Sequence, residues 1–179
     1  MSRTNPYIKK RRSAKRTLLI YGEGLSEQIF LKHLRGLYSY GSDLTVTIRN
    51  GKGGTAIDII KNAINDHGEF DRRVVVLDND KSKLEMKQAR TDAKRRGIEI
   101  LENSPCLEAT LLTILKPGRS YSGRTSAWCK REFESKYLNK KKRTEIDEYK
   151  RFFPKKVLEA QRANVSVLNM LISLMQGKK

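Results

Sequence analysis

Four short aliphatic runs alternate with four segments of helical periodicity between residues 17 and 115. The run at 73–77 is rich in valine and lacks polar alternation, which is typical of a strand buried on both faces of a parallel sheet. Strands that alternate with helices form parallel sheets with right-handed crossovers. The sequence therefore predicts an α/β fold, in which an open sheet of four parallel strands is flanked by helices. The predicted strands are 17–21, 44–49, 73–77 and 98–101.

Helical periodicity continues beyond the last predicted strand. The segment 154–176 carries an apolar stripe, which either core packing or a homodimer interface would explain. Its members are Leu158, Val165, Leu168, Ile172 and Met175. The predicted helices are 25–38, 56–64, 83–96, 107–115, 125–138 and 154–176, with a basic loop at 139–142.

The chain of 179 residues has a formal net charge of +18, which is distributed unevenly. Residues 1–16 hold seven Lys or Arg and no acid, and residues 116–156 hold fourteen basic against five acidic residues. Residues 17–115 hold fourteen of each sign. This pattern predicts a flexible basic arm at 1–16, a neutral α/β core at 17–115, and a basic helical extension at 116–179 that packs on the core.

The excess of positive charge indicates a polyanion as partner, because a merely solvated surface mixes the two signs more evenly. Tyr137 and Tyr149, near the basic run at 140–143, would add rings for base stacking, although such runs are also often only solvated. We therefore expect a nucleic acid, RNA or DNA, as the partner. The candidate nucleic-acid-binding residues are Lys9, Lys10, Arg11, Arg12, Lys52, Lys140, Lys141, Lys142 and Arg143.

The composition disfavours several other classes of protein. Two cysteines without CxxC spacing and two isolated histidines argue against zinc fingers, zinc hydrolases and a disulfide framework. The apolar run at 18–20 is too short for the core of a signal peptide, and no apolar run has the length of a membrane span. We expect a cytoplasmic protein of a reducing compartment, with no membrane partner.

Acidic side chains follow two of the predicted strands in this otherwise basic chain. Glu23 comes just after the first strand, and Asp78 and Asp80 follow the third. The carboxyl ends of parallel strands meet at one edge of the sheet, where ligands usually bind. If the extended run continues through Asp80, the two aspartates point the same way. Glu27, one helical turn after Glu23, and Glu108, after the fourth strand, are further candidates.

Carboxylate oxygens are preferred ligands of Mg²⁺ and Mn²⁺. The five acids therefore predict a site for Mg²⁺ or Mn²⁺ at this edge of the sheet. Each acid also has a structural explanation, since a Glu at a helix start favours the helix dipole and an Asp-x-Asp pair is common in turns. The coincidence of acids at two neighbouring strand ends favours the metal site.

The turn Gly51-Lys52-Gly53-Gly54-Thr55 precedes a predicted helix. Exposed N–H groups at a helix start attract anions, so this turn resembles a phosphate cradle. It lacks the GxxxxGK[ST] spacing, which disfavours a nucleotide triphosphatase and leaves a plain glycine-rich turn as the alternative. Lys52 remains a candidate contact to a substrate phosphate.

Two segments carry a resemblance to a known family. They are Leu-Leu-Ile-Tyr-Gly-Glu-Gly-Leu-Ser-Glu at 18–27 and Val-Val-Val-Leu-Asp-Asn-Asp at 74–80. They resemble the Toprim module of type IA topoisomerases, bacterial primases, OLD-type nucleases and ribosomal-RNA maturation nucleases. With Asn-Ser-Pro-Cys-Leu-Glu at 103–108 added, the chain is most similar to the RloB-like family of small bacterial Toprim proteins, which are often associated with restriction and anti-phage loci.

The resemblance implies a Toprim-like fold over residues 17–115. It matches Glu23 to the invariant acid of the family and Asp78 and Asp80 to its metal-binding pair, while Glu27 and Glu108 match acids of subfamilies. The chain departs from the family pattern after Glu108. The pattern places a bulky aromatic residue one position beyond this acid, whereas this chain has Ala109-Thr110 there.

Together with the charge pattern, the resemblance predicts a Mg²⁺- or Mn²⁺-dependent nuclease that cleaves phosphodiesters in RNA or DNA in phage defence. Asp78 and Asp80 would bind the metal, and Glu23 would complete the site or act as general acid or base. Lys81 or Lys83 would offset the charge that develops on the phosphate. The second hypothesis is a non-catalytic nucleic-acid-binding or sensing subunit that works with a partner protein of a defence locus and binds without turnover.

Overall fold

A computed structural model describes residues 15–139 and 141–178 of the chain. Its centre is a four-stranded sheet in the order β2-β1-β3-β4, and all three strand pairings are parallel. The predicted α/β fold with an open parallel sheet is thus confirmed, and it is consistent with the fold that the Toprim resemblance implies. The strands are β1 (Arg16–Gly22), β2 (Leu44–Asn50), β3 (Arg72–Asp78) and β4 (Glu99–Asn103).

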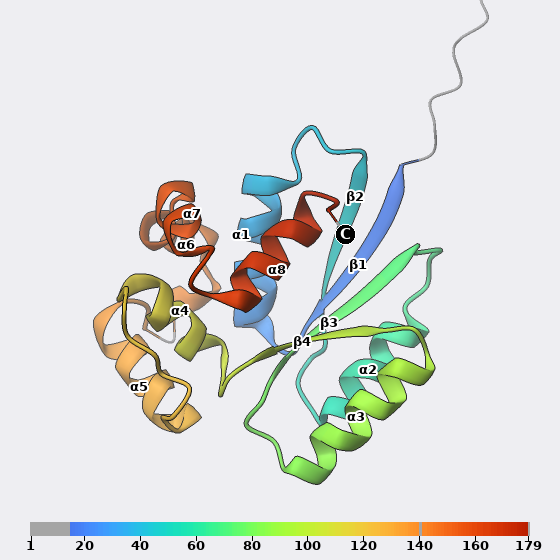
Figure 1. Cartoon of the computed structure of the whole chain (residues 1–179), viewed down its shortest axis with the longest axis horizontal. Helices are drawn as coiled ribbons and strands as arrows, with labels where there is room; N and C mark the ends of the chain where they lie inside the picture. The colour runs from blue at the N-terminus through green and yellow to red at the C-terminus, as the bar shows by residue number, and fades with distance from the viewer. Residues whose placement is uncertain (1–14, 140, 179) are drawn as a thin grey trace, which may run out of the picture.

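Helices cover both faces of the sheet, with α1 and α8 on one face and α2 and α3 on the other (Figure 1). The alternation of strand side chains produces this arrangement. Leu18 and Ile20 of β1 belong to a core shared with α1, α4 and α8, whereas Leu19 and Tyr21 belong to a separate core with α2 and α3. These helices are α1 (Leu25–Tyr38), α2 (Ala56–Asn65), α3 (Lys83–Arg95), α4 (Leu107–Leu115) and α8 (Ser166–Met175).

The remaining helices gather with α4 at one side of the molecule, on the left of Figure 1. There α5 and α7 pack on α4, and α6 packs on α1. The rings of Phe30 on α1, Tyr149 on α6 and Phe153 contact one another, with centroids 5.8 to 6.1 Å apart. This aromatic cluster fixes α6 to the core. The elements are α5 (Ser126–Lys136), the 3₁₀ helix η1 (Lys142–Thr144), α6 (Ile146–Phe152) and α7 (Lys155–Gln161).

One predicted helix is two helices in the structure. The single helix at 154–176 is wrong, because α7 ends at Gln161 and α8 begins at Ser166. The N–H of Asn164 donates to the carbonyl of Gln161 and closes a turn. Arg162, in this turn, donates to the side chain of Asn169 on α8 at 2.8 Å and so holds the turn against the second helix.

The apolar stripe that suggested the long helix is buried. All five of its side chains belong to the larger core, so core packing accounts for them. The stripe could not reveal the break, because Leu158 and Val165 are seven positions apart and this spacing fits a continuous helix equally well.

Helix α6 lies in a segment for which we predicted no helix. Its only buried residue is Tyr149, so an apolar period is absent. The charges were the available signal, since Asp147 and Glu148 lie in the first turn and Lys150 and Arg151 in the last, where each sign complements the helix dipole.

The other predicted elements agree with the structure to within two residues at each end. Among the residues that the structure describes, none of the helices has both the length and the apolar character that crossing a membrane requires.

Candidate metal centre

A pocket of about 320 Å³ lies at the carboxyl edge of the sheet, between the α/β core and the helical extension. Four acids from three segments line it: Glu23 and Glu27 where β1 leads into α1, Asp78 at the end of β3, and Glu108 on α4. β1 and β3 are paired neighbours, so their carboxyl ends lie side by side despite their separation in sequence. The pocket thus collects four of the five acids that the sequence singled out as metal ligands.

Asp78 is the last residue of β3 and is 5% exposed. Its Oδ1 accepts a hydrogen bond from the N–H of Leu107, the first residue of α4, at 2.9 Å. Burial, reinforced by the negative charges of the other three pocket acids, raises the pKa of Asp78 to about 9. Without a cation the carboxyl group therefore holds a proton at neutral pH, whereas a divalent cation beside it would favour the ionised form.

Glu23 is held by two donors. Its Oε2 accepts a hydrogen bond from the backbone N–H of Asp78 at 3.0 Å, and its Oε1 pairs with Lys81 Nζ at 3.0 Å. Burial lowers the pKa of Lys81. The hydrogen bond to Glu23 and the charge of Glu23 raise this pKa by more than burial lowers it, so the net shift is upward. The turn after β1 is thereby tied to the end of β3, as the predicted pairing of the two strands requires.

Glu27 is 7% exposed and has a structural role as well as a place in the pocket. Its Oε2 accepts a hydrogen bond from the N–H of Gly24 at 2.9 Å, which caps the start of α1. Burial, with the charges of Glu108 and Glu23, raises its pKa. The hydrogen bond from Gly24 satisfies Oε2 of Glu27 without any metal ion.

Asp78, Cys106 and Glu108 form a group of potential metal ligands, with one ligand atom of each within 4.8 Å of the others. All three residues are buried. Burial, followed by the charge of Glu108, raises the pKa of the Cys106 thiol, which stays protonated at neutral pH. Glu108 Oε2 is buried with no hydrogen-bond partner in the described part of the chain. A buried carboxylate oxygen without a donor costs free energy, so this group could hold a metal ion.

Two basic side chains of the extension line the same pocket, Lys130 on α5 and Arg143 on η1. Lys130 Nζ lies 4.0 Å from the carboxylate of Asp80, and Arg143 donates to Glu134 at 3.1 Å. Burial lowers the pKa of Lys130, but the charges of nearby acids, Glu108 first among them, raise it overall. The acids of the core therefore face cations of the extension.

Asp80 does not line the pocket with Asp78. β3 ends at Asp78, and the N–H of Asn79 donates to the carbonyl of Asn103 at 2.9 Å. The extended run thus stops before Asp80, and the strand alternation on which its orientation was predicted does not apply to it. Asp80 is exposed in the turn before α3, and Lys83 is the exposed first residue of that helix.

The glycine-rich turn after β2 adjoins the acids. The N–H of Gly53 donates to the carbonyl of Glu23 at 3.0 Å, and Gly53 lines the pocket. Lys52 in this turn is exposed and has a φ of 62°.

Among the other candidate nucleic-acid-binding residues, Lys142 pairs with Glu148 at 3.0 Å. Five candidate nucleic-acid-binding residues lie outside the described residues, namely Lys9, Lys10, Arg11, Arg12 and Lys140.

Sequence reasoning missed two residues of the candidate site, namely Cys106 beside two of the acids and Lys130 in the pocket lining. Cys106 was set aside because it lacks a second cysteine at metal-binding spacing, yet its place after the fourth strand was a usable signal. Lys130 carried no local signal, because only the packing of α5 on α4 brings it to the sheet edge.

Gly22 provides a local test of how the acids are positioned. A Cβ at Gly22 would lie 2.7 Å from Glu27 Cβ and 3.1 Å from the backbone nitrogen of Gln28, so the start of α1 would have to move. We expect Gly22→Ala to lower the free energy of unfolding by about 1–3 kcal/mol, the usual cost of overpacking. Gly36→Ala on the same helix meets no atom within 4 Å and should instead stabilise by about 0.5–1 kcal/mol. Thermal unfolding that shifts both variants in the same direction would contradict this packing.

Searches with protein-family models, curated proteins and solved structures find no match to this chain. Any function must therefore be argued from the residues of the chain itself, of which the acidic pocket is the most informative group.

Proposed function

We propose that this protein is a Mg²⁺- or Mn²⁺-dependent nuclease that cleaves phosphodiester bonds in RNA or DNA. The observation that carries the proposal is the convergence of four acids from three segments in one pocket, opposite two cations of the extension. Gathering like charges in a partly buried site is unfavourable unless a cation compensates them. A chain with a net charge of +18 around such a site suits a phosphate-rich substrate.

The donors fit a hard divalent cation. Asp78 and Glu108 would hold it, and the unpartnered Oε2 of Glu108 gives the ion an oxygen that no donor occupies. Zinc sites usually combine several Cys and His ligands, whereas this group offers one Cys and no His. Two carboxylates with a single thiol therefore favour Mg²⁺ or Mn²⁺ over Zn²⁺.

The remaining residues would orient and balance the reacting groups. A bound Mg²⁺ or Mn²⁺ ion supplies Lewis-acid activation of a phosphoryl oxygen and lowers the pKa of a coordinated water. Glu23, fixed by Lys81 and the N–H of Asp78, would complete the acidic site without needing to reorganise. Lys81 would also offset negative charge on the phosphate, and Asp80 would help to position Lys130.

A role in phage defence, with or without a partner protein, rests on the RloB-like resemblance alone. The chemistry of the pocket supports the cleavage of a phosphodiester.

A cleavage assay with the purified full chain tests the proposed function. Labelled tRNA, single-stranded RNA, single-stranded DNA and duplex DNA are incubated with Mg²⁺, with Mn²⁺ or with excess chelator. We expect cleavage of at least one substrate with metal and none with chelator, because without a metal ion the four acids would repel the phosphate and nothing would activate its oxygen. Cleavage that chelator leaves unchanged would overturn the metal-dependent mechanism, and salt-dependent binding without cleavage would favour the non-catalytic subunit.

A further inference from the structure

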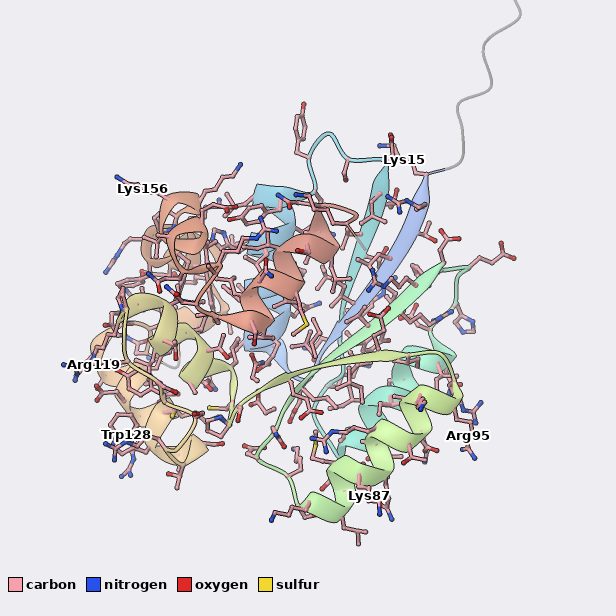
Figure 2. All side chains as sticks on the ribbon, viewed as in Figure 1. Lys15, Lys87, Arg95, Arg119, Trp128 and Lys156 are labelled. Atoms are coloured by element: carbon pink, nitrogen blue, oxygen red, sulfur yellow. The ribbon has the colours of Figure 1, made fainter. Side chains whose placement is uncertain are left out.

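Positive charge by itself does not locate the surface that binds the substrate. Figure 2 labels Lys15, Lys87, Arg95, Arg119 and Lys156, and these basic residues lie at widely separated places on the molecule. A solvated basic residue attracts nucleic acid only weakly and does not fix the position of a particular phosphate. A residue that positions a substrate must instead lie where the reacting phosphate lies.

Lys130 and Arg143 meet this requirement, because both line the acidic pocket. Their side chains are 43% and 28% exposed, so each is partly buried yet open to a ligand. Arg143 is held by Glu134 at 3.1 Å, which restrains its guanidinium group before any ligand arrives. A restrained cation loses less entropy on binding than a free one.

The charges of the pocket define what these two residues can bind. Four acids and two bases line it, which gives a formal charge of −2 that one divalent cation would neutralise. An anion entering the metal-loaded pocket would then meet Lys130 and Arg143 as positive groups of its wall. Ammonium and guanidinium groups are the usual partners of phosphate oxygens.

Resting on the proposed function, we propose that Lys130 and Arg143 form a phosphate subsite that holds the polynucleotide backbone beside the acids. The helical extension, and not only the α/β core, is therefore part of the binding site. The pocket volume of about 320 Å³ suits a single nucleotide rather than a duplex, so a single strand is the appropriate probe.

The test measures binding separately from cleavage. Fluorescence anisotropy follows a short labelled single-stranded oligonucleotide with Mg²⁺ and with Asp78 intact, and phosphorothioate linkages in the oligonucleotide prevent turnover. We expect the pair Lys130→Gln and Arg143→Gln to weaken binding at least tenfold. The slope of log affinity against log salt should fall by about 1.4, or about 0.7 for each lost contact with a single strand.

Matched controls are provided by the neighbouring basic residues. Arg131→Gln and Lys136→Gln on α5 remove the same amount of charge from the extension, and neither residue lines the pocket. We expect this pair to weaken binding less than threefold, and Lys130→Arg to retain it. Equal losses for the two pairs would overturn the subsite and leave a general electrostatic attraction.

The subsite and the nuclease proposal can fail independently. If the Lys130 and Arg143 pair selectively loses binding, the subsite stands even where the wild-type protein cleaves nothing. If the wild-type protein cleaves with metal and the same pair binds and cleaves as well as the controls, the subsite is wrong and the nuclease proposal stands.

Discussion

Asp78→Asn is expected to lower metal-dependent cleavage by more than 10²-fold and at the same time to stabilise the metal-free fold. Loss of a group that only orients a ligand typically costs 10–100-fold, so loss of the ligand itself should cost more. The amide oxygen can still accept the 2.9 Å hydrogen bond from Leu107, so the end of β3 keeps its anchor. Removing a buried acid that is crowded by three others should stabilise the metal-free protein by about 1–4 kcal/mol near neutral pH, because each pH unit above the reference pKa of 3.8 costs the wild type up to about 1.4 kcal/mol.

The stabilisation by Asp78→Asn should depend on pH in a defined direction. The pKa of Asp78 is about 9 in the folded state against a reference value of 3.8, so folding requires a proton that the unfolded chain releases between these values. The free energy of unfolding of the wild-type protein therefore decreases as pH rises from about 4 to about 9. The Asn variant lacks this decrease. Its advantage in Tm should grow with pH, by about 2–4 °C for each kcal/mol.

Metal should reverse the order of the two proteins. Mg²⁺ or Mn²⁺ binds the ionised carboxylate, so it should raise the Tm of the wild-type protein, more so at higher pH, and leave Asp78→Asn nearly unchanged. Asp92→Asn on α3 serves as control, because Asp92 is a partly exposed acid that pairs with Arg95 away from the pocket. An Asp78→Asn variant that still gains stability from metal as the wild type does would remove Asp78 from the site.

Phe30→Ala should produce the largest loss of stability, about 3–5 kcal/mol, as expected for emptying a buried aromatic site. Phe30 is 1% exposed on α1, and its ring lies 6.0 Å from that of Tyr149 and 5.8 Å from that of Phe153. These contacts attach α6 to the core, and η1 with Arg143 precedes α6 directly. Urea denaturation with an unchanged m-value would report the loss of stability in a two-state transition.

Phe152→Ala provides the comparison for Phe30→Ala. Phe152 is only partly buried and contacts Tyr137 edge-to-face at 5.6 Å, so its removal should cost less than half as much. The Phe30 variant, and not the Phe152 variant, should also weaken oligonucleotide binding under folded conditions, because Arg143 loses its support. Equal stability losses for the two variants would show that the aromatic cluster does not anchor the extension.

The sequence predicted the sheet well because the signals for it are local. Runs such as 73–77 are short and continuously apolar, and the helices between them repeat apolar residues at helical spacing. The approach of Glu23 to Asp78 also followed from sequence, because each lies at a strand end and parallel strands align their carboxyl ends. The extension was harder to predict, because its helices α6 and α7 are short and, taken together, their charged residues outnumber the apolar residues that would show a helical period.

Local sequence patterns are enough to specify the parallel α/β core and the edge at which its acids gather, because strand and helix periods act over a few neighbouring residues. Long-range packing brings Cys106 to Asp78 and Glu108, ends the strand before Asp80, and places Lys130 and Arg143 opposite the acids. These outcomes depend on how α5 and η1 pack against the core. Such contacts join residues far apart in the chain, and no local period records them.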